Sequence, residues 1–167
     1  FDVATFKVAA YSEETDQMPG LQTLIFFESV PDKYIEVDKE EWQWDSIENT
    51  VPIIIPESYL TLYNFGFAES QNLPVLSKST ISLINFKLRV WGSNGQFTYF
   101  NSKIAGFSST LNTILVPKKF LDWANAKYGN GRQENPNRLL IEFEKGEDET
   151  SLSYFENKQM SLMLKMN

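Results

Sequence analysis

The fold is decided by a ten-residue stretch that occurs twice. Residues 55–64 read IPESYLTLYN, and 61 positions further along residues 116–125 read VPKKFLDWAN. Each copy follows an apolar run and places a proline second, then two hydrophilic residues, an aromatic-leucine pair and, four residues after that leucine, an asparagine. This pattern predicts, in each copy, a strand that leads directly into a helix.

Six residues of the repeated stretch are predicted to be structural. Pro56 and Pro117 should occupy the first helical position, where the missing N–H of proline costs nothing. The aromatic-leucine pairs are expected to pack the two helices on a sheet, with the first helix ending at residues 64–66. These pairs are Tyr59 with Leu60 and Phe120 with Leu121.

Apolar runs and turn signals on either side of the two copies predict a strand-rich domain. The run at 24–27 is uninterrupted and is expected to be covered on both faces. The sequence GSNG at 92–95 predicts a hairpin, and the acidic residues 147–149 predict the start of a helix that reaches residue 155. Further strands are expected at 1–10, 34–37, 81–91, 96–107, 138–144 and 162–166.

The composition of the 167 residues excludes several classes of function. The formal net charge of −7 repels phosphate backbones, so nucleic acid is not an expected partner. The chain has no histidine and no cysteine, which excludes a Ser-His-Asp triad, a Cys-His pair, a disulfide framework and thiolate metal sites. A pair of carboxylates could still hydrolyse glycosides.

Four aromatic residues are candidates for contact with a ligand. Trp42 and Trp44 lie two apart, which in an extended segment places both rings on one face. They could form a sugar-stacking platform or a membrane anchor, or they could be a flap that packs on the sheet. Phe65 and Phe67 flank a glycine and could either form a ligand slot or pin the end of the first helix in the core.

Two lysines are candidates for contact with a partner protein. Lys118 and Lys119 lie where the second helix should begin, and cations are unfavourable near a helix N-terminus. They could mark a partner surface. The alternative is that they are solvated surface residues, because salt screens the unfavourable interaction.

Several segments resemble the extracytoplasmic domains of FtsX-like, MacB-like ABC transporter permeases. They are VPIIIPESYLTLYNFGFA at 51–68, KIAGF at 103–107, LNTILVPKKFLDWAN at 111–125 and NPNRLLIE at 135–142. The resemblance extends over roughly residues 21–145. It implies a loop domain between the first two transmembrane helices of a permease.

The resemblance also implies an α+β architecture in which a ferredoxin-like subdomain of strand-helix units carries an inserted β-rich subdomain. The β-rich parts are expected at about 1–50 and 73–110, and the strand-helix parts at about 51–66 and 112–167. All of them belong to a single excised domain. No apolar run of the chain approaches the ~20 residues that cross a bilayer, so the transmembrane helices are expected outside this piece.

The function implied by the resemblance is non-catalytic and periplasmic, within an inner-membrane protein. The domain would couple ATP-driven transmembrane motion to substrate export or to an envelope partner. No cofactor is expected here, since a separate component binds ATP. Implied partners are the transporter's own transmembrane helices, the ABC ATPase subunit, a second copy of the permease and a periplasmic or outer-membrane protein. The alternatives are a free-standing glycan- or lipid-binding module and a carboxylate-based hydrolase.

Overall fold

The computed structural model describes residues 1–14, 20 and 22–131, and the predictions for 138–144, 147–155 and 162–166 lie outside this part of the chain. The strands are β1 (Asp2–Val3), β2 (Lys7–Ser12), β3 (Gln22–Ile25), β4 (Phe27–Ser29), β5 (Thr50–Pro56), β6 (Phe86–Trp91), β7 (Phe97–Ser108) and β8 (Ile114–Leu115). The helices are η1 (Asp32–Tyr34), α1 (Glu57–Leu62), η2 (Tyr63–Ala68), α2 (Lys78–Ser82) and α3 (Lys118–Tyr128); η1 is a 3₁₀-helix and η2 a π-helix. The predicted α+β class is confirmed.

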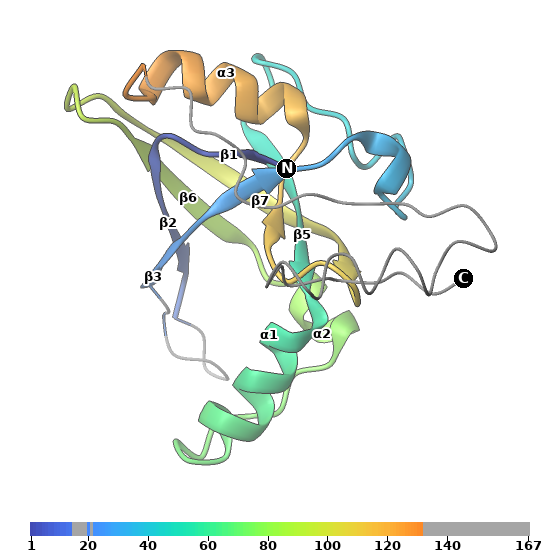
Figure 1. Ribbon diagram of the computed structural model, residues 1–167. Helices are drawn as coiled ribbons and strands as arrows, with labels where there is room; N and C mark the ends of the chain where they lie inside the picture. The colour runs from blue at the N-terminus through green and yellow to red at the C-terminus, as the bar shows by residue number, and fades with distance from the viewer. Residues whose placement is uncertain (15–19, 21, 132–167) are drawn as a thin grey trace, which may run out of the picture.

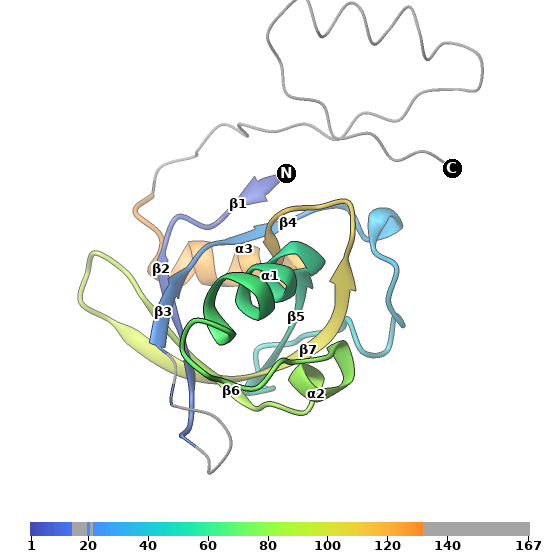
Figure 2. The same cartoon turned by 90° about the horizontal axis from the view of Figure 1, so that it is seen from below.

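All eight strands belong to one mixed sheet in the order β1-β4-β8-β5-β7-β6-β2-β3. At one end of this order β1 pairs with β4, and at the other end β2 pairs with β3. Because β1 leads into β2 and β3 leads into β4 along the chain, the two pairs form one continuous antiparallel ribbon that belongs to both ends of the sheet. The sheet therefore curls into a barrel-like ring. Viewed along its axis, the strands encircle α1 (Figure 2), while α3 covers the opposite end (Figure 1).

A bend in the ribbon allows this closure. Val3 pairs with Glu28 and Val8 pairs with Ile25, so five steps along one strand face only three along the other. The two extra residues leave the ladder and turn the chain from the β8 side of the ring to the β6 side. The aromatic ring of Phe6 points into the core from this bend.

Phe120 of α3 lies at the centre of the main core. Its ring is fully buried and makes edge-on contacts with four other rings, in the geometry that aromatic pairs prefer. The ring centroids lie 6.4 Å from Phe6, 6.2 Å from Phe27, 5.0 Å from Trp44 and 5.6 Å from Phe100. The second copy of the repeated stretch thus packs as predicted.

The central strand β5 is buried on both faces. Ile53 and Ile55 point into the main core, whereas Ile54 joins a second cluster on the outer face. Trp44 belongs to the first cluster and Trp42 to the second, so the connection between η1 and β5 contributes one tryptophan to each. An unbroken apolar run is what such a doubly covered strand requires.

Several element predictions were wrong. Residues 34–37 form no strand, and the strand predicted at 81–91 begins only at Phe86, since residues 78–82 form α2. The strand predicted at 1–10 is broken by the bend into β1 and β2. The run at 24–27 is not covered on both faces by the described residues, because the side chain of Leu24 is 68% exposed.

The positions of the two prolines also differ from the prediction. Pro56 and Pro117 are the capping residues that precede α1 and α3, with extended ψ angles of 137° and 136°. The carbonyl of Pro117 still accepts the hydrogen bond of Leu121, at 3.1 Å. The first helix does not end at residues 64–66, because η2 extends it to Ala68.

Candidate functional site

An apolar cavity of about 810 Å³ lies inside the ring. Its lining includes residues of α1, which covers this end of the ring (Figure 2). Alternate residues of a strand face the same side, so inward-facing side chains of every strand reach it. Most of its lining is aliphatic or aromatic. The polar lining residues are Thr23, Glu28, Tyr59, Tyr63, Asn112 and Thr113.

The cover of the cavity consists of α1, η2 and α2. Neither α1 nor α2 contains a buried residue, which sets this cover apart from α3. Ile81 of α2 packs against the main core while partly buried, and hydrogen bonds add to this contact and hold the cover together. The side chain of Ser58 donates to Asn112 at 2.8 Å, and Tyr63 donates to the Pro74 carbonyl at 3.3 Å.

Asn64 makes the most specific contact within the cover. Its amide nitrogen donates to the Leu76 carbonyl and its amide oxygen accepts from the Leu76 N–H, both at 2.8 Å. This pair of bonds joins η2 to the segment before α2. Leu76 is thereby held as part of the cavity wall.

Exposed apolar side chains gather around the mouth. Phe26 interrupts the ribbon between β3 and β4 and is 79% exposed, although it lines the cavity. Leu62, Phe65 and Leu83 are exposed on the cover without lining the cavity. The ribbon and the cover therefore both carry exposed apolar side chains.

The electrostatics of the cavity are simple. Glu28 is the only acidic residue among the described lining residues, and no lysine or arginine is among them. The nearest cation on the cover is Lys78, whose ammonium lies 2.5 Å from the Glu57 carboxylate. The described residues hold no group of three or more histidine, cysteine, aspartate or glutamate side chains that could bind a metal.

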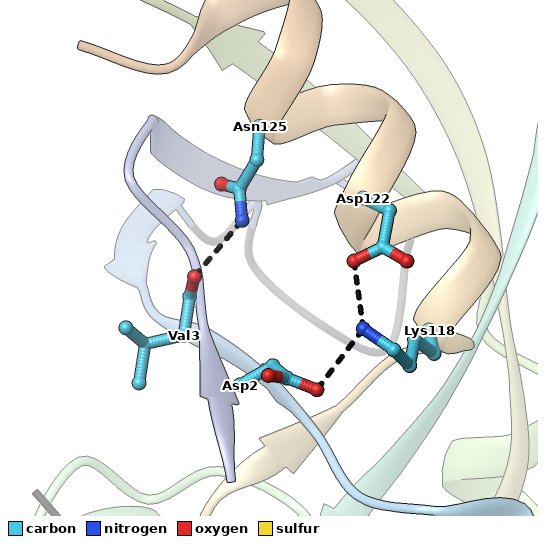
Figure 3. Close-up of polar contacts among 5 residues, drawn as sticks. All are labelled: Asp2, Val3, Lys118, Asp122 and Asn125. Atoms are coloured by element: carbon cyan, nitrogen blue, oxygen red, sulfur yellow. Dashed lines mark hydrogen bonds and ion pairs between the residues drawn. The ribbon is translucent and has the colours of Figure 1, made fainter. Parts of the chain in front are cut away.

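At the opposite end of the ring, α3 holds the N-terminal stretch (Figure 3). Lys118 Nζ lies 3.2 Å from the Asp2 carboxylate and 2.9 Å from the Asp122 carboxylate. The hydrogen bond to Asp122 and then that to Asp2 raise the pKa of Lys118, against the opposing effect of partial burial. Lys118 and Lys119 are both exposed, and Lys118 makes intramolecular ion pairs.

Asn125 holds the bend of the ribbon. Its amide oxygen accepts from the Thr5 N–H at 2.7 Å and from the Thr5 hydroxyl at 3.0 Å. Its amide nitrogen donates to the Val3 carbonyl at 3.0 Å, the bond drawn in Figure 3. These bonds satisfy backbone groups that the bend removes from the ladder. Asn125 and Asn64 occupy equivalent positions in the two copies, and the repeat is the signal that could have identified both as structural contacts.

The structure separates the predicted aromatic candidates. Trp42 and Trp44 are buried and do not share a face, because their segment is not extended. Phe65 and Phe67 are exposed, so they do not pin the end of the helix in the core. Tyr59 is 42% exposed and Leu60 is half-buried, and both line the cavity rather than packing α1 firmly on the sheet.

The fold and the site together are a mixed α+β ring with a helical cover over an apolar cavity. Comparison of the sequence with protein-family models identifies the family of the chain. A family model described as probable transporter periplasmic core domain matches residues 1–163, and the chain belongs to this family. It is a periplasmic domain of a transporter. No curated protein and no solved structure matches the sequence. In the part of the chain that is described, no helix is long and apolar enough to cross a bilayer.

Proposed function

We propose that this domain belongs to an FtsX-like, MacB-like ABC transporter permease and couples ATP-driven motion of the membrane helices to substrate export or to an envelope partner. The observation that carries the proposal is the match of a transporter periplasmic family to residues 1–163. The two proline-led strand-helix units add support, since both lie within the segments that resemble those permeases.

The attachment of the N-terminal stretch to α3 suits a domain that transmits motion. Asp2 is tied to Lys118, and Val3 and Thr5 are tied to Asn125. A displacement of this stretch would be passed directly to α3 and to the aromatic core around Phe120. A connection made only by exposed loops would dissipate the same displacement.

The proposed role is non-catalytic, with ATP bound by a separate component of the transporter. The chain has neither histidine nor cysteine to act as an acid, base or nucleophile at neutral pH. The proposed partners are the membrane helices of the permease, its ATPase subunit, a second permease copy and an envelope protein. A glycan platform at Trp42 and Trp44 has no support, because both rings are buried.

The first test concerns location and assembly. The absence of native cysteine makes Ser93→Cys, on the exposed hairpin, a unique label within the domain. In intact cells with a permeabilised outer membrane, a membrane-impermeant maleimide should label this variant of the full-length protein, and an ABC ATPase should co-purify with it. Labelling that requires lysis of the inner membrane, or purification without any ATPase, would contradict the proposal.

The second test concerns coupling. Lys118→Gln removes the ion pair to Asp2 in the N-terminal stretch, together with the pair to Asp122 within α3, whereas Lys119→Gln is a matched control on the adjacent exposed residue. In the full transporter, Lys118→Gln should lower transport or partner activation per ATP hydrolysed, and Lys119→Gln should not. Equal coupling in both variants would show that the motion is not passed through this contact.

A further inference from the structure

We propose that the cavity beneath α1 binds one uncharged apolar molecule, of the kind represented by a neutral lipid chain or a long-chain alcohol. The inference concerns the domain itself and holds whichever class of transporter carries it. It rests on the size, the lining and the charge of the cavity.

The size fits a single small molecule. Small-molecule sites in proteins enclose roughly 300–1,000 Å³ and are lined mostly by apolar side chains with a few polar groups. The cavity of about 810 Å³ lies within this range, and its wall includes Ile55, Phe86, Leu88 and Ile104. Interiors of folded domains are otherwise close-packed, so a space of this size that is open at its mouth is accessible to water or to a ligand.

The lining disfavours an anionic ligand. A buried carboxylate or phosphate needs a paired cation, because desolvation of an unpaired charge is costly. The described lining residues include no lysine or arginine, the acidic residue Glu28 is among them, and Lys78 at the cover is paired with Glu57. The net charge of −7 acts in the same direction at longer range. An uncharged molecule meets none of these costs.

The mouth suits entry of such a molecule. Phe26 lines the cavity from the open side of the ribbon, and Tyr59 lines it from the cover. Both side chains are substantially exposed, as 79% of Phe26 and 42% of Tyr59 is accessible to solvent. An apolar ligand would cover both rings, and the Tyr59 hydroxyl could remain in contact with water.

The experiment measures binding of N-phenylnaphthylamine, an uncharged dye whose fluorescence rises in apolar surroundings, to the purified 167-residue domain. We expect saturable binding of one dye per chain, with displacement by dodecanol. Dodecanoate, which has the same chain and a carboxylate, should compete at least ~10-fold less well, because its charge would be buried without a cation.

Two pairs of variants locate the binding. Ala10→Phe fills the cavity from β2, and Thr23→Trp fills it from the exposed strand β3; either should reduce dye affinity at least ~10-fold, since the added ring takes the ligand's space. Ala126→Phe, on the exposed face of α3, is the matched control. Phe65→Ser removes exposed apolar surface outside the cavity and should leave binding unchanged.

Thermal melts establish that each variant is folded before binding is compared. The proposal is overturned if the folded domain shows no saturable binding, if Phe65→Ser abolishes binding while the filling variants retain it, or if dodecanoate competes as well as dodecanol. The first outcome would mean that the cavity is closed or occupied in solution. The second would assign the dye to the outer surface of the cover.

Discussion

At the scale of single residues, the two asparagines of the repeated stretch perform the same task at different places. Asn64 and Asn125 each use both ends of the side-chain amide to satisfy a backbone N–H and a backbone carbonyl. An amide is suited to this because it offers a donor and an acceptor in one plane. One contact fixes the cover of the cavity, and the other fixes the bend that closes the sheet.

We predict that Asn125→Ala destabilises the domain by ~2 kcal/mol, because it leaves partly buried backbone groups of Val3 and Thr5 without partners. Asn125→Asp keeps the acceptor and loses the donor to Val3, and should cost less than the alanine variant at neutral pH. Urea unfolding measures both. Equal stability of Asn125→Ala and the wild type would show that water replaces the contact without penalty.

Phe120 and Tyr59, the aromatic residues of the two aromatic-leucine pairs, should differ sharply in their contribution to stability. Phe120→Ala should cost ~3–5 kcal/mol, the range for removal of a buried aromatic side chain, because its ring lies at the centre of the core. Tyr59→Ala should cost under ~1 kcal/mol, since its side chain is 42% exposed. Matched urea melts test the pair, and similar losses would mean that α1 packs more tightly than described.

Lys118 gives a prediction for alkaline pH. Its pKa is raised, chiefly by the hydrogen bond to Asp122. The contribution of Lys118 to stability is therefore complete at pH values below the pKa that Lys118 has in the unfolded chain. The contribution is lost as pH rises through the higher pKa of the folded state. The stability of Lys118→Met should therefore fall less between neutral and alkaline pH than that of the matched variant Lys119→Met. Parallel pH profiles from thermal melts would contradict this.

At the scale of elements, the burial of the second helix could be predicted from the sequence, whereas that of the first could not. In α3, Phe120, Leu121, Ala124 and Tyr128 fall on one helical face, and all four are buried. In α1 and η2, Tyr59, Leu60 and Tyr63 also share one helical face, but that face lines the cavity instead of packing against buried side chains. Local sequence shows a helix in both copies, but burial depends on what lies opposite each one.

Other elements were missed for local reasons. The strand predicted at residues 81–91 took no account of Ser77, whose side chain accepts a hydrogen bond from the Thr80 N–H and caps α2. The hairpin at 92–95 was predicted correctly, because Asn94 and Gly95 carry a specific turn signal and Gly95 adopts a φ of 77°. The cavity could not be predicted at all, since its lining comes from every strand of the ring.

Two glycines in different elements should respond in opposite ways to alanine substitution. Gly66 lies within η2 with open space around the position of a Cβ, so Gly66→Ala should stabilise the domain by ~0.5–1 kcal/mol through the unfolded chain. A Cβ at Gly92 would lie 2.1 Å from the Tyr128 carbonyl oxygen, so Gly92→Ala should be clearly destabilising. Thermal melts of both variants measure the change in stability. A change of the same sign in both variants would refute the prediction that Gly66 has room for a Cβ and Gly92 does not.

At the scale of the whole molecule, the ring joins segments that lie far apart along the chain. The β-rich segments and the strand-helix segments supply neighbouring strands of one sheet, as in the pairing of β5 with β7 and of β4 with β8. This order depends on pairing between distant segments, which no local pattern specifies.

We therefore expect the domain to unfold in one cooperative transition. Tryptophan fluorescence reports on the core and its outer face, where Trp42, Trp44 and Trp123 lie, and far-ultraviolet circular dichroism reports on the sheet and helices. The urea midpoints of the two signals should coincide, as they do for a two-state domain. Separate midpoints would indicate that two parts of the sheet unfold independently.

The bend held by Asn125 also has a consequence for the time course of folding. It joins residues 3–5 to α3 across a sequence separation of 120 residues, and such long-range contacts form slowly because a large loop must close first. During synthesis the ribbon leaves the ribosome long before its helical partner, so ring closure should be a late step. Refolding kinetics of Asn125→Ala test this: the variant should mainly unfold faster, with little change in its folding rate.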